Sequence, residues 1–346
     1  MIKNLLLFAI FFLCISCSTS KETISTDKEM TVDYSTKYAE TITAKDLGKH
    51  LFIYASDEFN GRDTGEPGQK KASEYLKNFY LKSGIKSPKN DSNYYQKVPS
   101  QYFTKNVFGK KPLKDSENVI ALIKGTEKPE EIIVISSHLD HIGSKNGKIY
   151  NGADDDGSGT VAVLEIAEAF KKASDEGKGP KRSILLLHVT GEEKGLLGSK
   201  YYTENPIFPL SNTITNLNID MIGRVDDIHK GKPNYIYLIG SDKLSSQLHN
   251  ISESINRKYL NIDLDYRYND ENDPNRFYYR SDHYNFAKHN IPIIFYFNGI
   301  HDDYHKPTDT PDKINYKLLE SRTRLIFHTA WEIANRNERI KVDKKN

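Results

Sequence analysis

Cysteine is missing from almost the whole chain. Both cysteines of the 346-residue sequence, Cys14 and Cys17, lie within its first 17 residues. The remaining residues therefore form no disulfide and offer no thiolate as a nucleophile or a zinc ligand. An excess of one charge is missing too, because 49 Lys and Arg residues face 47 Asp and Glu residues. Nucleic-acid binding normally needs a strongly basic surface, so we expect no nucleic-acid partner.

Long hydrophobic runs are missing except at the N-terminus, where residues 5–15 are apolar and follow Lys3. A membrane span needs roughly 20 apolar residues, whereas the core of a secretory signal needs roughly 7 to 15. Residues 1–17 are thus predicted to be an export signal. Ser16 before Cys17 is typical of a bacterial lipoprotein signal, in which Cys17 becomes the lipidated N-terminus. A plain secretory signal is the alternative, because Cys14 stands where leucine is usual.

This signal determines the expected location and domain organisation. Residues 18–40 are rich in Ser, Thr, Lys and Glu without apolar periodicity, which is typical of a flexible tether. Residues 41–340 are predicted to form a single folded domain. We expect an exported protein, held in the cell envelope facing the periplasm or the outside, that meets the membrane only through lipid on Cys17; secretion is the alternative.

Short apolar, β-branched runs alternate with helical patterns along the predicted domain. The runs lie at 118–123, 132–136, 184–189, 214–219, 235–239 and 291–297, and the clearest helical spacings lie at 72–79, 163–170 and 319–333. Strands that alternate with helices predict an α/β fold with a mostly parallel sheet covered on both faces. Ligands of such sheets bind at the carboxyl ends of the strands.

Histidines and carboxylates gather where these predicted strands end. They are, in chain order, His138, Asp140, Glu192, Glu193, Asp220 and His305. Such a set without cysteine is what zinc, manganese or cobalt requires in a hydrolytic site, and zinc is the first choice. Two cations about 3.5 to 4 Å apart would need a bridging carboxylate.

The segment GADDDGSGT offers three carboxylates for such a bridge, Asp154, Asp155 and Asp156. For Asp156 we favour the alternative that its side chain caps the helix beginning near Gly159. Asp154 and Asp155 remain open as bridging candidates on spacing alone.

Six motifs follow one another along the chain. They read SSHLDHIG, GADDDGSGT, TGEEKGLLGS, NIDMIG, RSDHYNF and YHKPTDT, after a lead-in that reads ASDEFNGRDTGEPG. Their order resembles that of metallopeptidase family 28, the di-zinc aminopeptidases, over about residues 47–333. The resemblance implies a three-layer α/β/α sandwich of the zinc-exopeptidase type around a mixed, mostly parallel sheet.

The resemblance also implies two zinc ions per chain and a ligand set for them. Asp155 would bridge both ions, His138 and Asp220 would complete one site, and Glu193 and His305 the other. The neighbouring residue His141 is expected in the outer shell or on the surface, because strand-end neighbours face opposite sides and the ligand set is already full.

Three further residues acquire catalytic roles from the resemblance. Glu192 would act as general base and acid, and Tyr304 would donate to the developing oxyanion. Asp140 would accept a proton from the far nitrogen of His138 or steady its ring. Glu192 and Asp220 are the candidates for holding the substrate's α-amino group.

The motif RSDHYNF is expected to contribute to substrate binding. Arg280, Asp282 and His283 would line or brace the cleft, although buried structural ion pairs would give the same sequence pattern.

The resemblance implies an exopeptidase that hydrolyses the N-terminal peptide bond of peptides with a free N-terminus, through a water held between two zinc ions. A glutaminyl cyclase-like acyltransferase with one zinc is the first alternative. A non-catalytic peptide-binding lipoprotein is the second, and a carboxypeptidase variant stays open. Retention of Glu192 and Tyr304 argues against pure binding, which needs no general base.

Overall fold

The structure is a computed structural model that describes residues 32–89, 92–106 and 113–344. The predicted export signal, with Cys17, and most of the predicted tether lie outside these ranges. From Asp33 onward the described chain forms one compact unit. Helix α1 (Tyr34–Ala39) belongs to it, since Tyr38 is buried and the helix packs against α5 and α9. The tether prediction is therefore wrong for residues 34–39.

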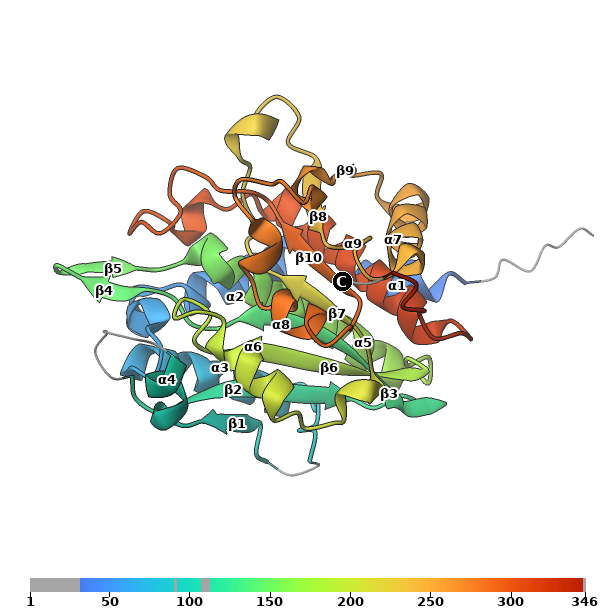
Figure 1. Cartoon of the computed structure of the whole chain (residues 1–346), viewed down its shortest axis with the longest axis horizontal. Helices are drawn as coiled ribbons and strands as arrows, with labels where there is room; N and C mark the ends of the chain where they lie inside the picture. Colours follow the sequence, from blue (N-terminus) through green and yellow to red (C-terminus); the bar gives the residue numbers. More distant parts are fainter. Residues whose placement is uncertain (1–31, 90–91, 107–112, 345–346) are drawn as a thin grey trace, which may run out of the picture. The chain divides into compact units, whose positions relative to one another are not determined.

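An eight-stranded mixed sheet with the order β1-β2-β6-β3-β7-β10-β8-β9 runs through this unit (Figure 1). The central neighbours β6, β3, β7 and β10 are parallel, and β2 and β8 flank them in the antiparallel direction. The strands are β1 (Tyr95–Val98), β2 (Ser116–Ile123), β3 (Lys128–His138), β6 (Arg182–Val189), β7 (Thr213–Ile219), β8 (Tyr235–Ile239), β9 (Asp263–Asp265) and β10 (Ile293–Phe297). All six predicted strands are present, and the mixed, mostly parallel sheet is confirmed.

The central strands are covered on both faces, and β7 buries Asn216 and Asn218 between its apolar residues. Every residue of β6, β7 and β10 is buried. Successive side chains of β6 enter separate cores, with Leu186 on one side of the sheet and Leu185 and Leu187 on the other. Parallel strands are found almost only in such doubly covered sheets.

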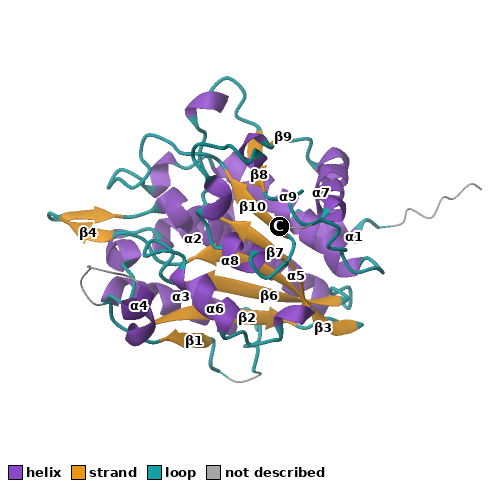
Figure 2. Cartoon of the chain, in the orientation of Figure 1, coloured by secondary structure: helices purple, strands orange, loops and turns teal. Residues whose placement is uncertain are grey.

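Helices on both faces complete three layers, as predicted (Figure 2). The larger core lies between one face and α1, α2, α3, α5, α7 and α9, and the smaller core lies between the other face and α6 and α8. The helices after α1 are α2 (Ala44–Tyr54), α3 (Pro67–Lys82), α4 (Ser100–Asn106), α5 (Gly159–Asp175), α6 (Leu197–Glu204), α7 (Ser246–Tyr259), α8 (His283–Ala287) and α9 (Tyr316–Asn335).

Two smaller findings complete the architecture. A hairpin that the sequence did not predict, β4 (Gly143–Lys145) and β5 (Lys148–Tyr150), projects beyond the sheet directly before the GADDDGSGT segment. Among the described residues, no helix is long and apolar enough to cross a membrane.

Candidate metal centre

The predicted ligands meet at the carboxyl ends of the four parallel strands. His138 is the last residue of β3, and Asp220 directly follows β7. Glu192 and Glu193 follow β6, and His305 lies in the loop after β10. Parallel strands end at one edge of a sheet, so four chain segments deliver their side chains to one place.

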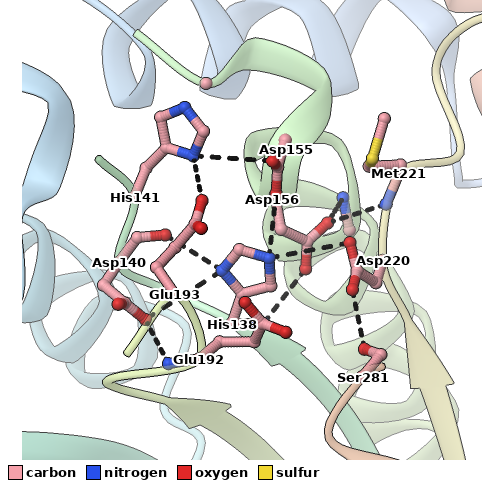
Figure 3. A network of polar contacts seen from close by, with 12 residues as sticks. His138, Asp140, His141, Asp155, Asp156, Glu192, Glu193, Asp220, Met221 and Ser281 are labelled. Carbon is pink, nitrogen blue, oxygen red and sulfur yellow. Dashed lines mark hydrogen bonds and ion pairs between the residues drawn. The ribbon is translucent and has the colours of Figure 1, made fainter. Parts of the chain in front are cut away.

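The first cluster is formed by His138, Asp155 and Asp220, whose ligand atoms lie close enough to hold one metal ion. The Nε2 atom of His138 lies 3.1 Å from Oδ1 of Asp155 and 3.6 Å from Oδ1 of Asp220 (Figure 3). All three residues are buried. This is the set that the sequence predicted for one of the two sites.

The second cluster is built around the other carboxylate oxygen of Asp155. Oδ2 of Asp155 lies 3.1 Å from Nε2 of His305, which lies 3.3 Å from Oε2 of Glu193. The Nδ1 atom of His141 lies 2.8 Å from Oε1 of Glu193 and 3.7 Å from Oδ2 of Asp155. His141, Asp155 and Glu193 thus form a second group with metal-ligand spacing.

His141 lies where the sequence did not place it. It is fully buried, and its ring faces Asp155 and Glu193, so the surface alternative is wrong (Figure 3). The strand ends at His138, so the alternation of neighbouring side chains no longer applies three residues later. A main-chain hydrogen bond from His141 N to Arg62 O, 3.1 Å long, fixes the segment instead.

A carboxylate behind the centre holds the segment that carries Asp155. The main-chain N–H groups of Asp154 and Asp155 donate to the carboxylate of Asp309, at 3.0 to 3.2 Å. Asp154 itself accepts from Gly223 N at 2.7 Å and lies 3.2 Å from Nε2 of His301. Asp154 therefore braces the centre from behind and does not bridge its two clusters.

Asp156 joins three segments around the centre. Its Oδ1 accepts from the N–H groups of Gly159 and Met221, at 2.9 and 3.2 Å, and its Oδ2 accepts from His138 N at 3.0 Å (Figure 3). The contact with Gly159 at the start of α5 agrees with the capping role that we favoured. The peptide bond between Asp155 and Asp156 is cis.

The orientation of His138 is set by a main-chain group. Its Nδ1 donates to the carbonyl oxygen of Asp140 at 3.0 Å, which directs Nε2 toward Asp155 and Asp220. The Asp140 carboxylate lies 4.0 Å from Nδ1 and accepts instead from Thr64 Oγ1 and Glu192 N, at 2.6 and 3.2 Å. Asp140 therefore contacts the ring through its main-chain carbonyl, and its carboxylate lies too far from Nδ1 for a hydrogen bond.

Charges in the centre are strongly coupled. Burial raises the pKa of Asp155, but His141, His138 and His305 hold that pKa well below its usual value. Burial lowers the pKa of His305, yet Asp155 and Glu193 raise it to about 10. Without a cation, protonated imidazole therefore balances the buried carboxylates, and metal binding would release these protons.

A cavity opens beside the first cluster. Its polar lining includes Glu192, Tyr304 and Arg280, and its apolar lining is formed by Met221, Phe277, Phe295, Phe297 and Ile300.

Of the three predicted substrate-binding residues only Arg280 reaches this cavity. The carboxylate of Asp282 instead accepts from Ser199 Oγ at 2.5 Å, and Nε2 of His283 donates to the carbonyl oxygen of Tyr278 at 2.8 Å. Asp282 and His283 thus do not line this cavity.

Among the residues with predicted catalytic roles, Glu192 and Tyr304 both have raised pKa values. Burial raises the pKa of Glu192 well above its usual value, and the carboxylates of Glu193 and Asp220 add to the rise. Burial and nearby carboxylates also raise the pKa of Tyr304, so its hydroxyl keeps its proton and can donate. The Tyr304 ring stacks on His305 with 3.9 Å between ring centroids.

Several supporting residues were missed by the sequence analysis. Ser281 Oγ donates to Oδ2 of Asp220 at 2.6 Å and accepts from Asn218 Nδ2 at 2.9 Å (Figure 3). Arg62 and Thr64 support the residues after β3 from the segment before α3. All three lie within or beside quoted motifs, but their types and spacing alone carry no metal-site signal.

The unsatisfied atoms of the centre fit a divalent cation. Nδ1 of His141, Oδ2 of Asp155 and Oε1 of Glu193 are buried and have no well-directed hydrogen-bond partner in the described part of the chain. Buried polar atoms are normally paired. Imidazole nitrogens and carboxylate oxygens that converge without partners are the donor set of zinc and similar metals.

The sequence profile of peptidase family M28 matches residues 118–330, which is more than half of the chain. A probable leucine aminopeptidase from Arthroderma otae is 29% identical over 223 residues, covering 63% of this chain and 57% of that protein. The alignments span only 8 to 27% of the length of the first curated relatives that the chain matches.

Solved structures share the fold. A zinc aminopeptidase from Bacillus subtilis aligns with a TM-score of 0.66 and 16% identity, covering 88% of this chain and 98% of that one. Glutaminyl cyclase from Porphyromonas gingivalis aligns with a TM-score of 0.64 and 17% identity, covering 84% and 98%. Since a peptidase and a cyclase are equally similar, the fold alone does not separate the two activities.

Proposed function

The chain belongs to peptidase family M28, and on this premise we propose that it is a two-zinc aminopeptidase. The observation that carries the proposal is the position of Asp155, whose two carboxylate oxygens each face a separate cluster of ligands. Oδ1 faces His138 and Asp220, and Oδ2 faces Glu193 and His305. A carboxylate with this environment is suited to bridge two cations. A one-zinc cyclase would not need both clusters.

The bound ions would lower the pKa of a water and polarise the carbonyl of the scissile bond. Glu192 is placed to accept the proton of that water, because its side chain lines the cavity beside Asp155 and Asp220. The same carboxyl group, with its raised pKa, can then hand the proton to the leaving amine.

Two other residues would act on the substrate directly. The protonated hydroxyl of Tyr304 lines the same cavity and would donate a hydrogen bond to the carbonyl oxygen as negative charge develops there. Carboxylates of Glu192 and Asp220 would hold the positively charged α-amino group. This contact selects peptides with a free N-terminus.

The cavity wall also supports a preference for the first residue of the peptide. Phe277, Phe295 and Phe297 line the same cavity as the carboxylates that would hold the amino group. An apolar side chain that enters such a pocket gains about 1.5 to 3 kcal/mol from burial. We therefore expect N-terminal leucine, methionine or phenylalanine to be released faster than aspartate or lysine.

A peptide-release assay tests this function. The protein from Ser18 onward, loaded with two equivalents of zinc, is given matched peptides with free or acetylated N-termini. Only the free peptides should be cleaved, and Glu192→Ala should lower kcat by about 10² to 10⁴ with zinc still bound. Glu168→Gln, an exposed carboxylate on α5, is the control and should leave kcat unchanged.

Other outcomes point to other activities. Ring closure of N-terminal glutamine without peptide release would show a cyclase, and release from the C-terminus would show a carboxypeptidase. Tight peptide binding without any turnover would show a binding protein. Cleavage by Glu192→Ala at the normal rate would remove Glu192 from the mechanism.

A further inference from the structure

His141 has no role among the residues that match the family motifs, yet its imidazole reaches the metal centre. We propose that His141 is a fourth protein ligand of the second metal position, beside Asp155, Glu193 and His305. The proposal rests on the two-metal function above and extends it, because it makes the two positions chemically unequal.

The spacing of the donor atoms supports this assignment. Four donors at the corners of a tetrahedron, with bonds of roughly 2.0 to 2.2 Å to zinc, lie about 3.3 to 3.6 Å apart. The observed separations to the two carboxylates are 2.8 and 3.7 Å for Nδ1 of His141, and 3.1 and 3.3 Å for Nε2 of His305. These four separations surround the expected value, and the donor atoms of His141, Asp155 and Glu193 all lie within 4.8 Å of one another.

Burial removes His141 from contact with bulk solvent. The residue is fully buried, and neither ring nitrogen has a well-directed hydrogen-bond partner in the described residues. Oε1 of Glu193 lacks such a partner as well, although Nδ1 lies only 2.8 Å away. A histidine that merely oriented Glu193 would direct an N–H group at its oxygen. The misdirected contact suits a cation between the two atoms better.

The two histidines approach the second position from different sides. Their rings lie 5.9 Å apart between centroids and meet at 68°. The His305 side chain is 38% exposed and lines the cavity, whereas His141 is buried and does not. The His141 imidazole thus lies on the interior side of the second metal position, and the His305 imidazole lies on its cavity side.

The number of protein ligands then distinguishes the two positions. Zinc with four protein ligands is typical of a structural site, and zinc with three retains a place for a reacting group. The first position has only His138, Asp155 and Asp220, and the latter two line the cavity with Glu192. The substrate would therefore react at the first position, and the second would hold its ion more tightly.

Metal titration of matched variants tests the assignment. Zinc is added to the metal-free protein against a competing chelator, for the wild type, His141→Phe and His305→Phe. Loss of an outer residue weakens metal binding about 10 to 100-fold, so loss of a ligand should weaken one of the two sites more than about 100-fold. Both variants should affect the same, tighter site. His328→Phe, a buried histidine stacked on Tyr259, is the control and should change neither affinity.

A measurement on the wild type keeps the test independent of folding. X-ray absorption of the two-zinc protein should show three imidazoles shared by two ions, whereas the motif-derived ligand set supplies two. Cobalt in the tighter site should give the intense visible bands of four-coordinate cobalt, and these should weaken in His141→Phe.

The outcomes separate this inference from the proposed function. If the wild type binds two zinc ions and cleaves peptides while His141→Phe keeps both affinities and the cobalt spectrum, only the role of His141 is wrong. A loss of less than 10-fold with an unchanged spectrum would likewise reduce His141 to an orienting partner of Glu193. If the wild type binds no pair of ions, the two-metal function fails, and this inference fails with it.

Discussion

At the scale of single residues, a buried arginine connects the two ligand-bearing loops. The guanidinium of Arg62 is 1% exposed and donates to the carbonyl oxygens of Leu139, Asn151 and Gly152, at 3.2, 2.6 and 2.8 Å. These carbonyls flank His138 on one loop and Asp155 on the other. No carboxylate pairs with this cation in the described residues. Besides these loop carbonyls, it donates to the carbonyl oxygen of Tyr54 at the end of α2, at 3.3 Å.

We expect Arg62→Met to weaken zinc binding by about 10 to 100-fold, the usual loss when a residue behind the ligands is removed. Arg182→Met is the matched control. Arg182 is equally buried and donates to the carbonyl oxygen of Ile333 at 3.1 Å, but it begins β6, at the end of the strand opposite the metal centre. A chelator competition assay should show lower affinity only for Arg62→Met; equal losses would show that both arginines act through overall stability.

At the scale of elements, a buried histidine joins β6 to a helix and a neighbouring strand. His188 lies between the hydroxyl of Tyr80 on α3, 2.6 Å from Nε2, and Oγ of Ser137 on β3, 2.9 Å from Nδ1. Burial lowers the pKa of His188 to about 3, compared with about 6.5 in the unfolded chain. The folded protein therefore keeps the ring neutral at a pH where the unfolded chain protonates it.

This pKa difference predicts a loss of stability in acid. Above pH 6.5 the His188 ring is neutral in both the folded and the unfolded state, so its contribution to stability is complete. As the pH falls toward 3, the unfolded chain binds a proton at this ring and the folded protein does not. The free energy of unfolding should fall by up to about 1.4 kcal/mol per pH unit through this group. His188→Gln should reduce the slope in urea unfolding of metal-free protein between pH 6.5 and 4, and the exposed control His289→Gln should not. Identical slopes would contradict the role of His188.

The buried strands could be predicted from the sequence, and the half-exposed strands could not. The strands β2, β3, β6, β8 and β10 were predicted because their runs are mostly apolar, and β7 was predicted although its run also contains Thr215, Asn216 and Asn218. The edge strands β1 and β9 were missed, since they are short and largely half-exposed and carry no such run. The hairpin of β4 and β5 was missed for the same reason.

In the candidate site, too, some residues could be predicted from the sequence and others could not. The ligand residues lie in local motifs at strand ends, so the sequence could indicate them. Their partners could not be predicted, because the residue types of Arg62, Thr64 and Asp309 carry no metal-site signal and the residues that they contact, within 139–155, lie far from them in the chain. His141 was misplaced because a rule for strands was extended beyond the end of β3, where the backbone bonds to residue 62 instead.

At the scale of the whole molecule, the metal centre concentrates buried negative charge at one edge of the sheet. The residues Asp140, Asp154, Asp155, Asp156, Asp220 and Asp282 are all buried there. Burial raises the pKa of Asp140, Asp156 and Asp282 above the usual value, because an ionised carboxylate loses its hydration there. Divalent cations would offset this repulsion, so metal binding and folding should be linked.

Removal of the metal should therefore lower the thermal stability of the whole folded unit. A ligand that binds only the folded state at 1,000 times its Kd adds about 4 kcal/mol, which corresponds to a Tm rise on the order of 10 °C for a domain of this size. Calorimetry of the chelator-treated protein, with and without added zinc, measures this difference. Asp155→Asn removes the one carboxylate that faces both clusters and should abolish most of the zinc-dependent rise, while the exposed-site variant Glu168→Gln should retain it. An equal rise in Asp155→Asn would show that zinc stabilises the fold from somewhere other than this centre.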